Sequence, residues 1–140
     1  MKLLNTNKLG SVGKFGEDAA IEYLRDMGYD IVARNTVYGN KEIDIIVTDM
    51  KYIVFVEVKT RTVTDHSGPL RFGTAPANAV DAKKKEHIKS AARLYLKEHK
   101  HRKLTRFDII EVYLDNEGEH YSINRINHIP RAFGAGIDKR

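Results

Sequence analysis

The period of hydrophobic positions changes along the chain, and each change marks an expected element. Small and apolar side chains recur at helical spacing from residue 13 to residue 27, which predicts a helix that Gly28 ends. Runs rich in β-branched and aromatic residues follow and predict three strands, over residues 29–38, 42–48 and 52–61. Only residues 49–51 separate the last two strands, so these two are expected to form a hairpin.

The second half of the chain repeats this change of period. Residues 62–76 contain glycine and proline without a clear period and are predicted to form a loop. A second helix is expected from residue 77 to 99, followed by two strands, over residues 104–114 and 121–129, with a turn at residues 115–118 and a segment without strand pattern from Pro130 onward. The order helix, three strands, helix, two strands predicts an α/β fold with a mixed five-stranded sheet flanked by helices.

Length and composition place this pattern in one domain. The 140 residues are expected to form a mobile N-terminal arm (1–12), a single domain (13–133) and a C-terminal tail (134–140). Charged residues make up 31% and hydrophobic ones 41%, and cysteine is absent, which excludes a disulfide framework and a thiolate site. The first residues turn polar too soon for a signal peptide, and no apolar run approaches the ~20 residues that span a bilayer. We therefore expect a cytoplasmic protein without a membrane partner.

Basic residues are concentrated rather than spread evenly. The formal net charge is +5, and lysines, arginines and histidines are dense at residues 83–85 and 97–106. Such patches attract polyanions, above all nucleic acid. The alternative is a solvated helix face followed by a basic turn.

Two carboxylates stand inside strands that are too apolar to lie exposed. Asp44 and Glu57 occupy the two strands of the expected hairpin, and Lys59 follows on the same face as Glu57 because side chains two apart on a strand point together. A two-residue loop of Met50 and Lys51 would set Asp44 directly opposite Glu57. A loop with an odd number of residues would send Asp44 to the other face instead.

Paired carboxylates favour a hard divalent cation. Each would raise the proton affinity of the other unless a cation neutralised both, and carboxylate, carbonyl and water ligands suit Mg²⁺ or Mn²⁺. The backbone carbonyl of Val58 lies beside the pair and is expected to contribute. Lys59 is placed to orient a bound water or to stabilise charge on a phosphate, as phosphodiester hydrolysis requires. The alternative is an exposed sheet face with a weak Glu57–Lys59 ion pair.

These motifs together resemble a known family. The sequence resembles the PD-(D/E)xK nuclease superfamily, with Ile43 where the eponymous proline often lies. It is more closely similar to the YraN-like family, uncharacterised protein family 0102, which is related to archaeal Holliday-junction resolvases. The similarity runs from about Gly13 to Phe133, and it rests on Gly16-Glu17, Ala20, Tyr23-Leu24, Ala33-Arg34-Asn35, Glu42-Ile43-Asp44, Val54 to Lys59, Val80 to Leu96, Arg106-Phe107-Asp108 and Ala132-Phe133.

The resemblance implies a restriction-endonuclease-like core in which Glu17 joins Asp44, Glu57 and Lys59 at one site. The residues alone would assign Glu17, in the first turn of the first helix, to the helix dipole. Lys84 is expected to reach the cleft from the second helix, or else to cover the edge of the core with its stem. Two further candidate phosphate contacts are Arg61 and Arg71, whereas Asp108 is expected to be structural.

Two hypotheses follow. The first is a metal-dependent endonuclease that cleaves structured or branched DNA, with Asp44, Glu57, the Val58 carbonyl and Glu17 at the metal. The second is a nucleic-acid-binding module of the same fold without turnover. Because a resolvase needs two sites that face two strands, the first hypothesis also predicts a homodimer.

Overall fold

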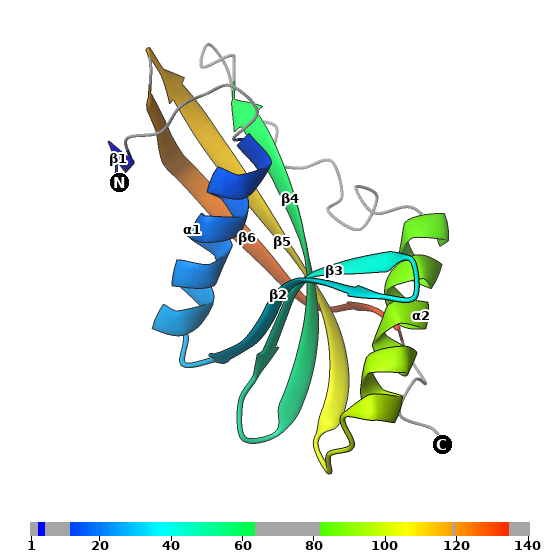
Figure 1. Cartoon of the computed structure of the whole chain (residues 1–140). Helices are drawn as coiled ribbons and strands as arrows, with labels where there is room; N and C mark the ends of the chain where they lie inside the picture. Colours follow the sequence, from blue (N-terminus) through cyan, green and yellow to red (C-terminus); the bar gives the residue numbers. More distant parts are fainter. Residues whose placement is uncertain (1–2, 5–11, 64–81, 119, 135–140) are drawn as a thin grey trace.

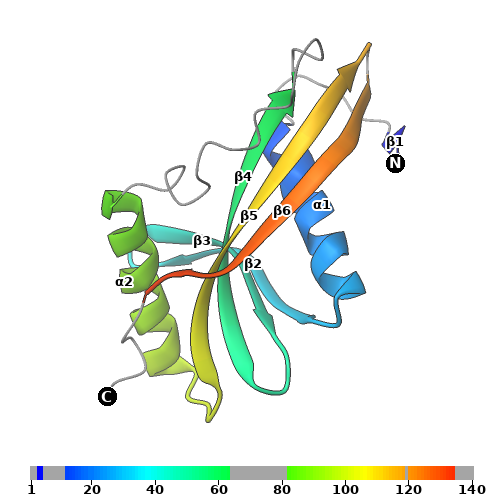
Figure 2. The same cartoon turned by 180° about the vertical axis from the view of Figure 1, so that it is seen from behind.

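The computed structural model describes residues 3–4, 12–63, 82–118 and 120–134 of the chain. Two helices lie on opposite faces of a mixed sheet (Figures 1 and 2). The elements in chain order are β1 (Leu3–Leu4), α1 (Val12–Asp26), β2 (Asp30–Tyr38), β3 (Lys41–Thr48), β4 (Tyr52–Val63), α2 (Ala82–Glu98), β5 (Leu104–Glu117) and β6 (His120–Phe133). The predicted α/β class with two helices and five long strands is confirmed, and the two-residue β1 adds a short sixth strand at one edge.

The sheet has the order β1-β6-β5-β4-β3-β2, and only β4 and β5 run parallel. A parallel pair cannot be joined by a tight turn, and α2 lies in the crossover between these two strands. Among the described residues, neither helix is long and apolar enough to cross a bilayer. The loop predicted for residues 62–76 is wrong for residues 62 and 63, because β4 continues through them and pairs with β5 there. The remainder of that predicted loop (64–76), residues 77–81 of the expected second helix, and most of the two termini lie outside the described residues.

The predicted end of the first helix is confirmed. Gly28 adopts a left-handed backbone with φ 98°, its N–H donates to the carbonyl of Arg25, and the N–H of Tyr29 donates to the carbonyl of Leu24. These bonds satisfy carbonyls that a helix end leaves without a partner, and glycine adopts this conformation without strain. The chain therefore turns directly into β2.

Two boundaries in the last hairpin differ from the sequence prediction. The turn expected at residues 115–118 is shorter, because β5 continues to Glu117, which pairs with His120. The strand expected to end at residue 129 continues through Pro130 to Phe133, whose ring stacks on Phe107 at 5.1 Å between centroids. Proline is tolerated there because the outer neighbour β1 pairs only with residues 121 and 122.

The core consists of two hydrophobic clusters, one on each face of the sheet. Val54, Val56 and Val58 of β4 pack against α1, whereas Ile53 and Phe55 of the same strand pack against α2. By this alternation the odd-numbered side chains of β4 point toward α2, and Glu57 and Lys59 belong to this odd-numbered set. The strand therefore places a carboxylate next to a hydrophobic cluster.

A close approach of α1 to β4 depends on Gly16. A Cβ built on Gly16 would lie within 2.8 Å of the Thr60 Cβ and still closer to its hydroxyl, so the helix and the strand would have to separate. We expect Gly16→Ala to lower the free energy of unfolding by about 1–3 kcal/mol, as overpacking usually does. Urea unfolding of this variant beside Gly13→Ala, where a Cβ meets nothing within 4 Å, measures the difference. Equal stability of the two variants would contradict the close packing.

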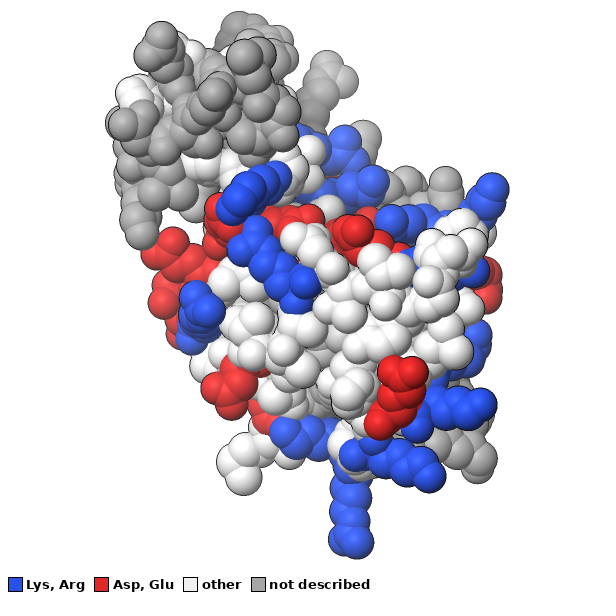
Figure 3. Space-filling view, in the orientation of Figure 1, with Lys and Arg blue, Asp and Glu red and all other residues white. Residues whose placement is uncertain are grey.

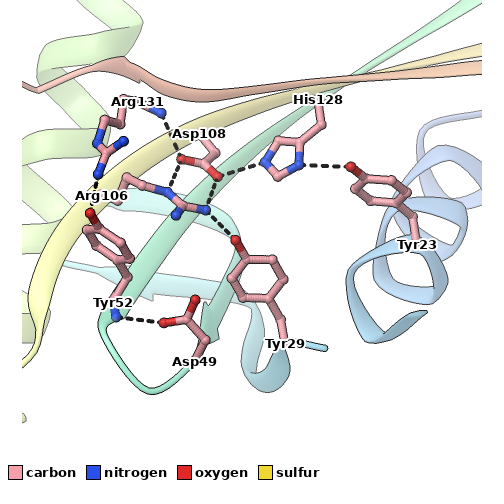
Figure 4. Close-up of polar contacts among 8 residues, drawn as sticks. All are labelled: Tyr23, Tyr29, Asp49, Tyr52, Arg106, Asp108, His128 and Arg131. Carbon is pink, nitrogen blue, oxygen red and sulfur yellow. Dashed lines mark hydrogen bonds and ion pairs between the residues drawn. The ribbon is translucent and has the colours of Figure 1, made fainter. Parts of the chain in front are cut away.

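A buried polar network joins β5, β6 and α1 (Figure 4). Asp108 is fully buried and accepts two hydrogen bonds from the Arg106 guanidinium, at 2.9 and 2.8 Å. The Nε2 of His128 lies 2.7 Å from the same carboxylate, and the backbone N–H of Arg131 donates to it at 3.1 Å. Burial alone would raise the pKa of Asp108, but the hydrogen bonds from His128 and Arg106 hold it below its usual value. The contacts fit the structural role expected of Asp108.

Candidate metal centre and phosphate contacts

The β3–β4 hairpin has the even register. The N–H of Asp49 donates to the carbonyl of Tyr52 at 3.1 Å, which leaves Met50 and Lys51 as a two-residue loop. The Asp49 carboxylate fixes this loop, because its Oδ1 accepts the N–H groups of Lys51 and Tyr52 at 2.8 and 2.7 Å. An aspartate that bonds the backbone ahead of it is a common turn former. The predicted even loop is confirmed.

The same register sets Asp44 opposite Glu57, at the point where the two strands separate. The ladder ends with Ile45 opposite Val56, and a continued ladder would next hydrogen-bond Val58 to Ile43. Instead, the N–H of Val58 donates to Oδ2 of Asp44 at 2.9 Å. Because the N–H and C=O of one strand residue point to the same side, the Val58 carbonyl also faces this gap.

The two carboxylates interact directly. Glu57 is only 4% exposed, and burial, the charge of Asp44 and a hydrogen bond with Asp44 together raise the pKa of Glu57 to about 8. Within the described part of the chain, Oε1 of Glu57 is buried without a hydrogen-bond partner. The pair therefore keeps a proton that an exposed pair would release, and one buried oxygen of Glu57 has no hydrogen-bond partner among the described residues.

Two lysines approach this pair. Lys84 Nζ, from α2, lies 3.8 Å from Oε2 of Glu57, and Lys59 follows on β4. The charges of both lysines lower the pKa of Glu57, but they do not reverse the effect of burial. The structure thus brings together the predicted Asp44, Glu57 and Lys84, with Lys59 within electrostatic range.

Glu17 faces the same region from the other side of the sheet. It lies in the second turn of α1, because the helix begins at Val12; the expected first-turn position is wrong, and the helix-dipole role has no basis. Burial first and then the charge of Asp44 raise the pKa of Glu17, while a hydrogen bond from Asn35 and the charge of Arg34 oppose them. Arg34 Nε lies 3.6 Å from the Glu17 carboxylate.

The donor set suits a hard cation but is not complete. Within the described residues, no three Asp, Glu, His or Cys side chains stand close enough together to bind one ion. Asp44, Glu57 and the Val58 carbonyl offer oxygen donors at one point, and the unpartnered Oε1 of Glu57 is a free ligand position. Two carboxylates with water in the remaining positions are typical of Mg²⁺ sites. The residues therefore fit Mg²⁺ or Mn²⁺, with Glu17 beside the site.

The candidate phosphate contacts are only partly described. Arg61 is exposed at the end of β4, with its Nε 3.7 Å from Oε2 of the buried Glu111. Arg71 lies outside the described residues. Sequence reasoning missed Asn35, which binds Glu17; its backbone has φ 50°, a conformation that asparagine adopts more readily than most residues.

Acidic and basic side chains alternate on the face shown in Figure 3. Acidic side chains form a band across the upper middle of this face, with basic ones beside and below it, and a broad uncharged area lies underneath. This face therefore presents charges of both signs rather than one continuous patch of a single sign.

Comparison with known proteins identifies the family. The family model described as "Uncharacterised protein family UPF0102" matches residues 16–112. A UPF0102 protein of Acetivibrio thermocellus is 37% identical over 134 residues, which cover 94% of this chain and 98% of that protein. A relative from Caldanaerobacter subterraneus is 40% identical over 134 residues, with 95% and 100% covered, and one from Solibacter usitatus is 46% identical over 105 residues, with 73% and 74% covered. The chain therefore belongs to the uncharacterised protein family UPF0102.

Proposed function

We propose that this protein is a metal-dependent endonuclease that hydrolyses phosphodiester bonds in structured or branched DNA. The observation that supports the proposal most is the pairing of the half-buried Asp44 with the buried Glu57, which has an oxygen without a partner among the described residues and two lysines beside it. Such a pair destabilises a protein that has no cation to bind there. The order of the elements is also compatible with a restriction-endonuclease-like core.

Each residue has a role in this proposal. Asp44, Glu57 and the Val58 carbonyl would hold Mg²⁺ or Mn²⁺, which when bound supplies an acidified water and neutralises phosphate charge. Glu17, whose pKa is raised by burial, would assist either as a further metal ligand or as the base that orients the attacking water. Lys59 stabilises the charge that develops on the phosphate.

Further contacts hold the substrate in the proposed complex. Lys84, whose Nζ lies 3.8 Å from Oε2 of Glu57, would turn to the phosphate once a cation is bound at the carboxylates. Arg61, which is exposed at the end of β4, contacts a further backbone phosphate, and Arg71 is a second candidate phosphate contact from the sequence. The enzyme acts in the cytoplasm as a homodimer, so that two sites reach two strands of a branched substrate.

A second candidate function is nucleic-acid binding without cleavage. The observation that favours it is the absence, within the described residues, of a third acidic or histidine side chain grouped with Asp44 and Glu57. A binding module would use the lysines of α2 and would gain nothing from the buried carboxylates. The two functions differ in whether product forms.

A cleavage assay decides between them. Labelled duplex, single-stranded, flap and four-way-junction DNA is incubated with the wild-type protein and Mg²⁺, Mn²⁺ or EDTA. We expect cleavage that needs the metal and that falls by at least about 100-fold in Asp44→Asn and in Glu57→Gln, because transition-state charge loses its metal. Glu86→Gln, the same change at an exposed position on α2, is the matched control and keeps wild-type activity. Binding without any cleavage under all conditions would support the second function.

A further inference from the structure

A pocket lies between the β2–β3 turn and the first turns of α2. It has a volume of about 250 Å³ and is lined by Asn40, Lys41, Glu42, Lys84 and His87. Lys84 also stands 3.8 Å from Oε2 of Glu57, so this one side chain both lines the pocket and approaches the carboxylate pair. Figures 1 and 2 show the β2–β3 turn against α2 in both views.

The two walls of the pocket are held together by contacts outside it. The ring of Tyr38 meets the ring of Tyr95 edge-on, with 5.4 Å between centroids. Gly39 lies so close to Leu94 that a Cβ there would stand 3.3 Å from Leu94 Cδ1, and its φ of 67° favours glycine. The pocket therefore has its shape without a ligand.

The lining favours an anion with hydrogen-bond acceptors. Two ammonium groups and an imidazole stand against one carboxylate, that of Glu42. Asn40 Oδ1 accepts a hydrogen bond from Lys41 Nζ at 3.1 Å, which directs this ammonium along the turn. The volume lies below the ~300–1,000 Å³ of pockets that enclose drug-sized molecules, so it suits a phosphate with part of its sugar rather than a whole ligand.

We propose that this pocket binds a backbone phosphate of the nucleic acid, next to the phosphate that the Asp44–Glu57 pair would cleave. The inference rests on the proposed function, because that function supplies a polyanionic strand at the neighbouring carboxylates. Lys84 stands between the two positions and holds the strand in register. Lys41 and His87 are binding residues that only the packing of the turn on α2 brings together.

Fluorescence anisotropy with a short labelled DNA duplex tests the pocket without any turnover. Titrations are run in EDTA and in Ca²⁺, with wild type, Lys41→Ala, His87→Ala and the double variant. We expect the double variant to bind about tenfold more weakly, and its plot of log affinity against log salt to be less steep by about one, because one phosphate contact is lost. Glu42→Gln, which removes the repelling carboxylate, is expected to bind more tightly.

Arg25→Ala is the control, since Arg25 is exposed in the last turn of α1, on the opposite face of the sheet from the pocket, and belongs to neither basic patch of the sequence. Circular dichroism checks that each variant folds. If an alanine variant does not fold, glutamine takes the place of alanine at that position, as in Lys41→Gln. Equal affinity of wild type and double variant would overturn the inference, as would an equal loss in Arg25→Ala. If the pocket variants lose affinity while no metal supports cleavage, the phosphate site stands and the endonuclease fails. If DNA is cleaved and the pocket variants bind normally, the endonuclease stands and the phosphate site fails.

Discussion

The metal-free Glu57→Gln variant is expected to be more stable than the wild type at pH 8 and about equally stable near pH 4.5. Burial beside Asp44 raises the pKa of Glu57 from 4.5 to about 8, so the folded state keeps a proton that the unfolded state releases. Wild-type stability therefore falls as the pH rises from 4.5 to 8, whereas glutamine has no proton to release. With 1.36 kcal/mol for each pKa unit, the difference reaches on the order of 4 kcal/mol at the upper end.

Urea unfolding of both proteins across this pH range, in EDTA, measures the difference. Glu86→Gln is again the control, because that carboxylate is exposed and its variant should follow the wild-type curve. Adding Mn²⁺ at pH 8 should raise the midpoint of the wild type and leave Glu57→Gln unchanged, since a ligand stabilises only the state that binds it. A Glu57→Gln variant less stable than wild type at pH 8 would show that the charge at Glu57 is already compensated.

Local sequence patterns were sufficient to predict the pairing of Asp44 with Glu57 in the candidate site. Two-residue alternation and the short loop place Asp44 and Glu57 face to face, and the register bears out that count. The loop lacks the Asn-Gly pair that is typical of such turns. The carboxylate of Asp49 stabilises the turn instead, because it accepts hydrogen bonds from two backbone N–H groups. Short-range chemistry of this kind can be inferred from sequence because it involves neighbours along the chain.

What the sequence did not predict depends on contacts between distant elements. The pocket at Lys41 and His87 exists only because the β2–β3 turn packs on α2, through ring contacts that no periodicity announces. Similarly, Pro130 suggested the end of a strand, but stacking of Phe133 on Phe107 extends β6 beyond it. In both cases tertiary packing overrides a local signal.

Asp108→Ala is expected to destabilise the protein by about 3–5 kcal/mol, because it leaves the Arg106 guanidinium buried without its counter-ion. Arg106 is 9% exposed, and its other described polar contact is a hydrogen bond to the Tyr29 hydroxyl at 2.5 Å. The change also removes the acceptor of His128 and of the Arg131 N–H, which ties the end of β6 to β5 (Figure 4). Urea unfolding measures the loss in the free energy of unfolding. A variant that does not fold at all would be a larger loss in the same direction.

The double variant Arg106→Met, Asp108→Leu distinguishes the effect of an unpaired charge from the effect of lost packing. Replacing both partners by apolar side chains removes the unpaired charge, so the double variant should recover much of the stability that Asp108→Ala loses. Tyr23→Phe removes only the hydroxyl that lies 3.0 Å from Nδ1 of His128 and should cost about 0.5–1.5 kcal/mol. A double variant as unstable as Asp108→Ala would contradict the role of the ion pair, because the loss would then come from packing or from the missing acceptor of His128 and the Arg131 N–H. A double variant that recovers stability would assign the loss to the uncompensated charge of Arg106.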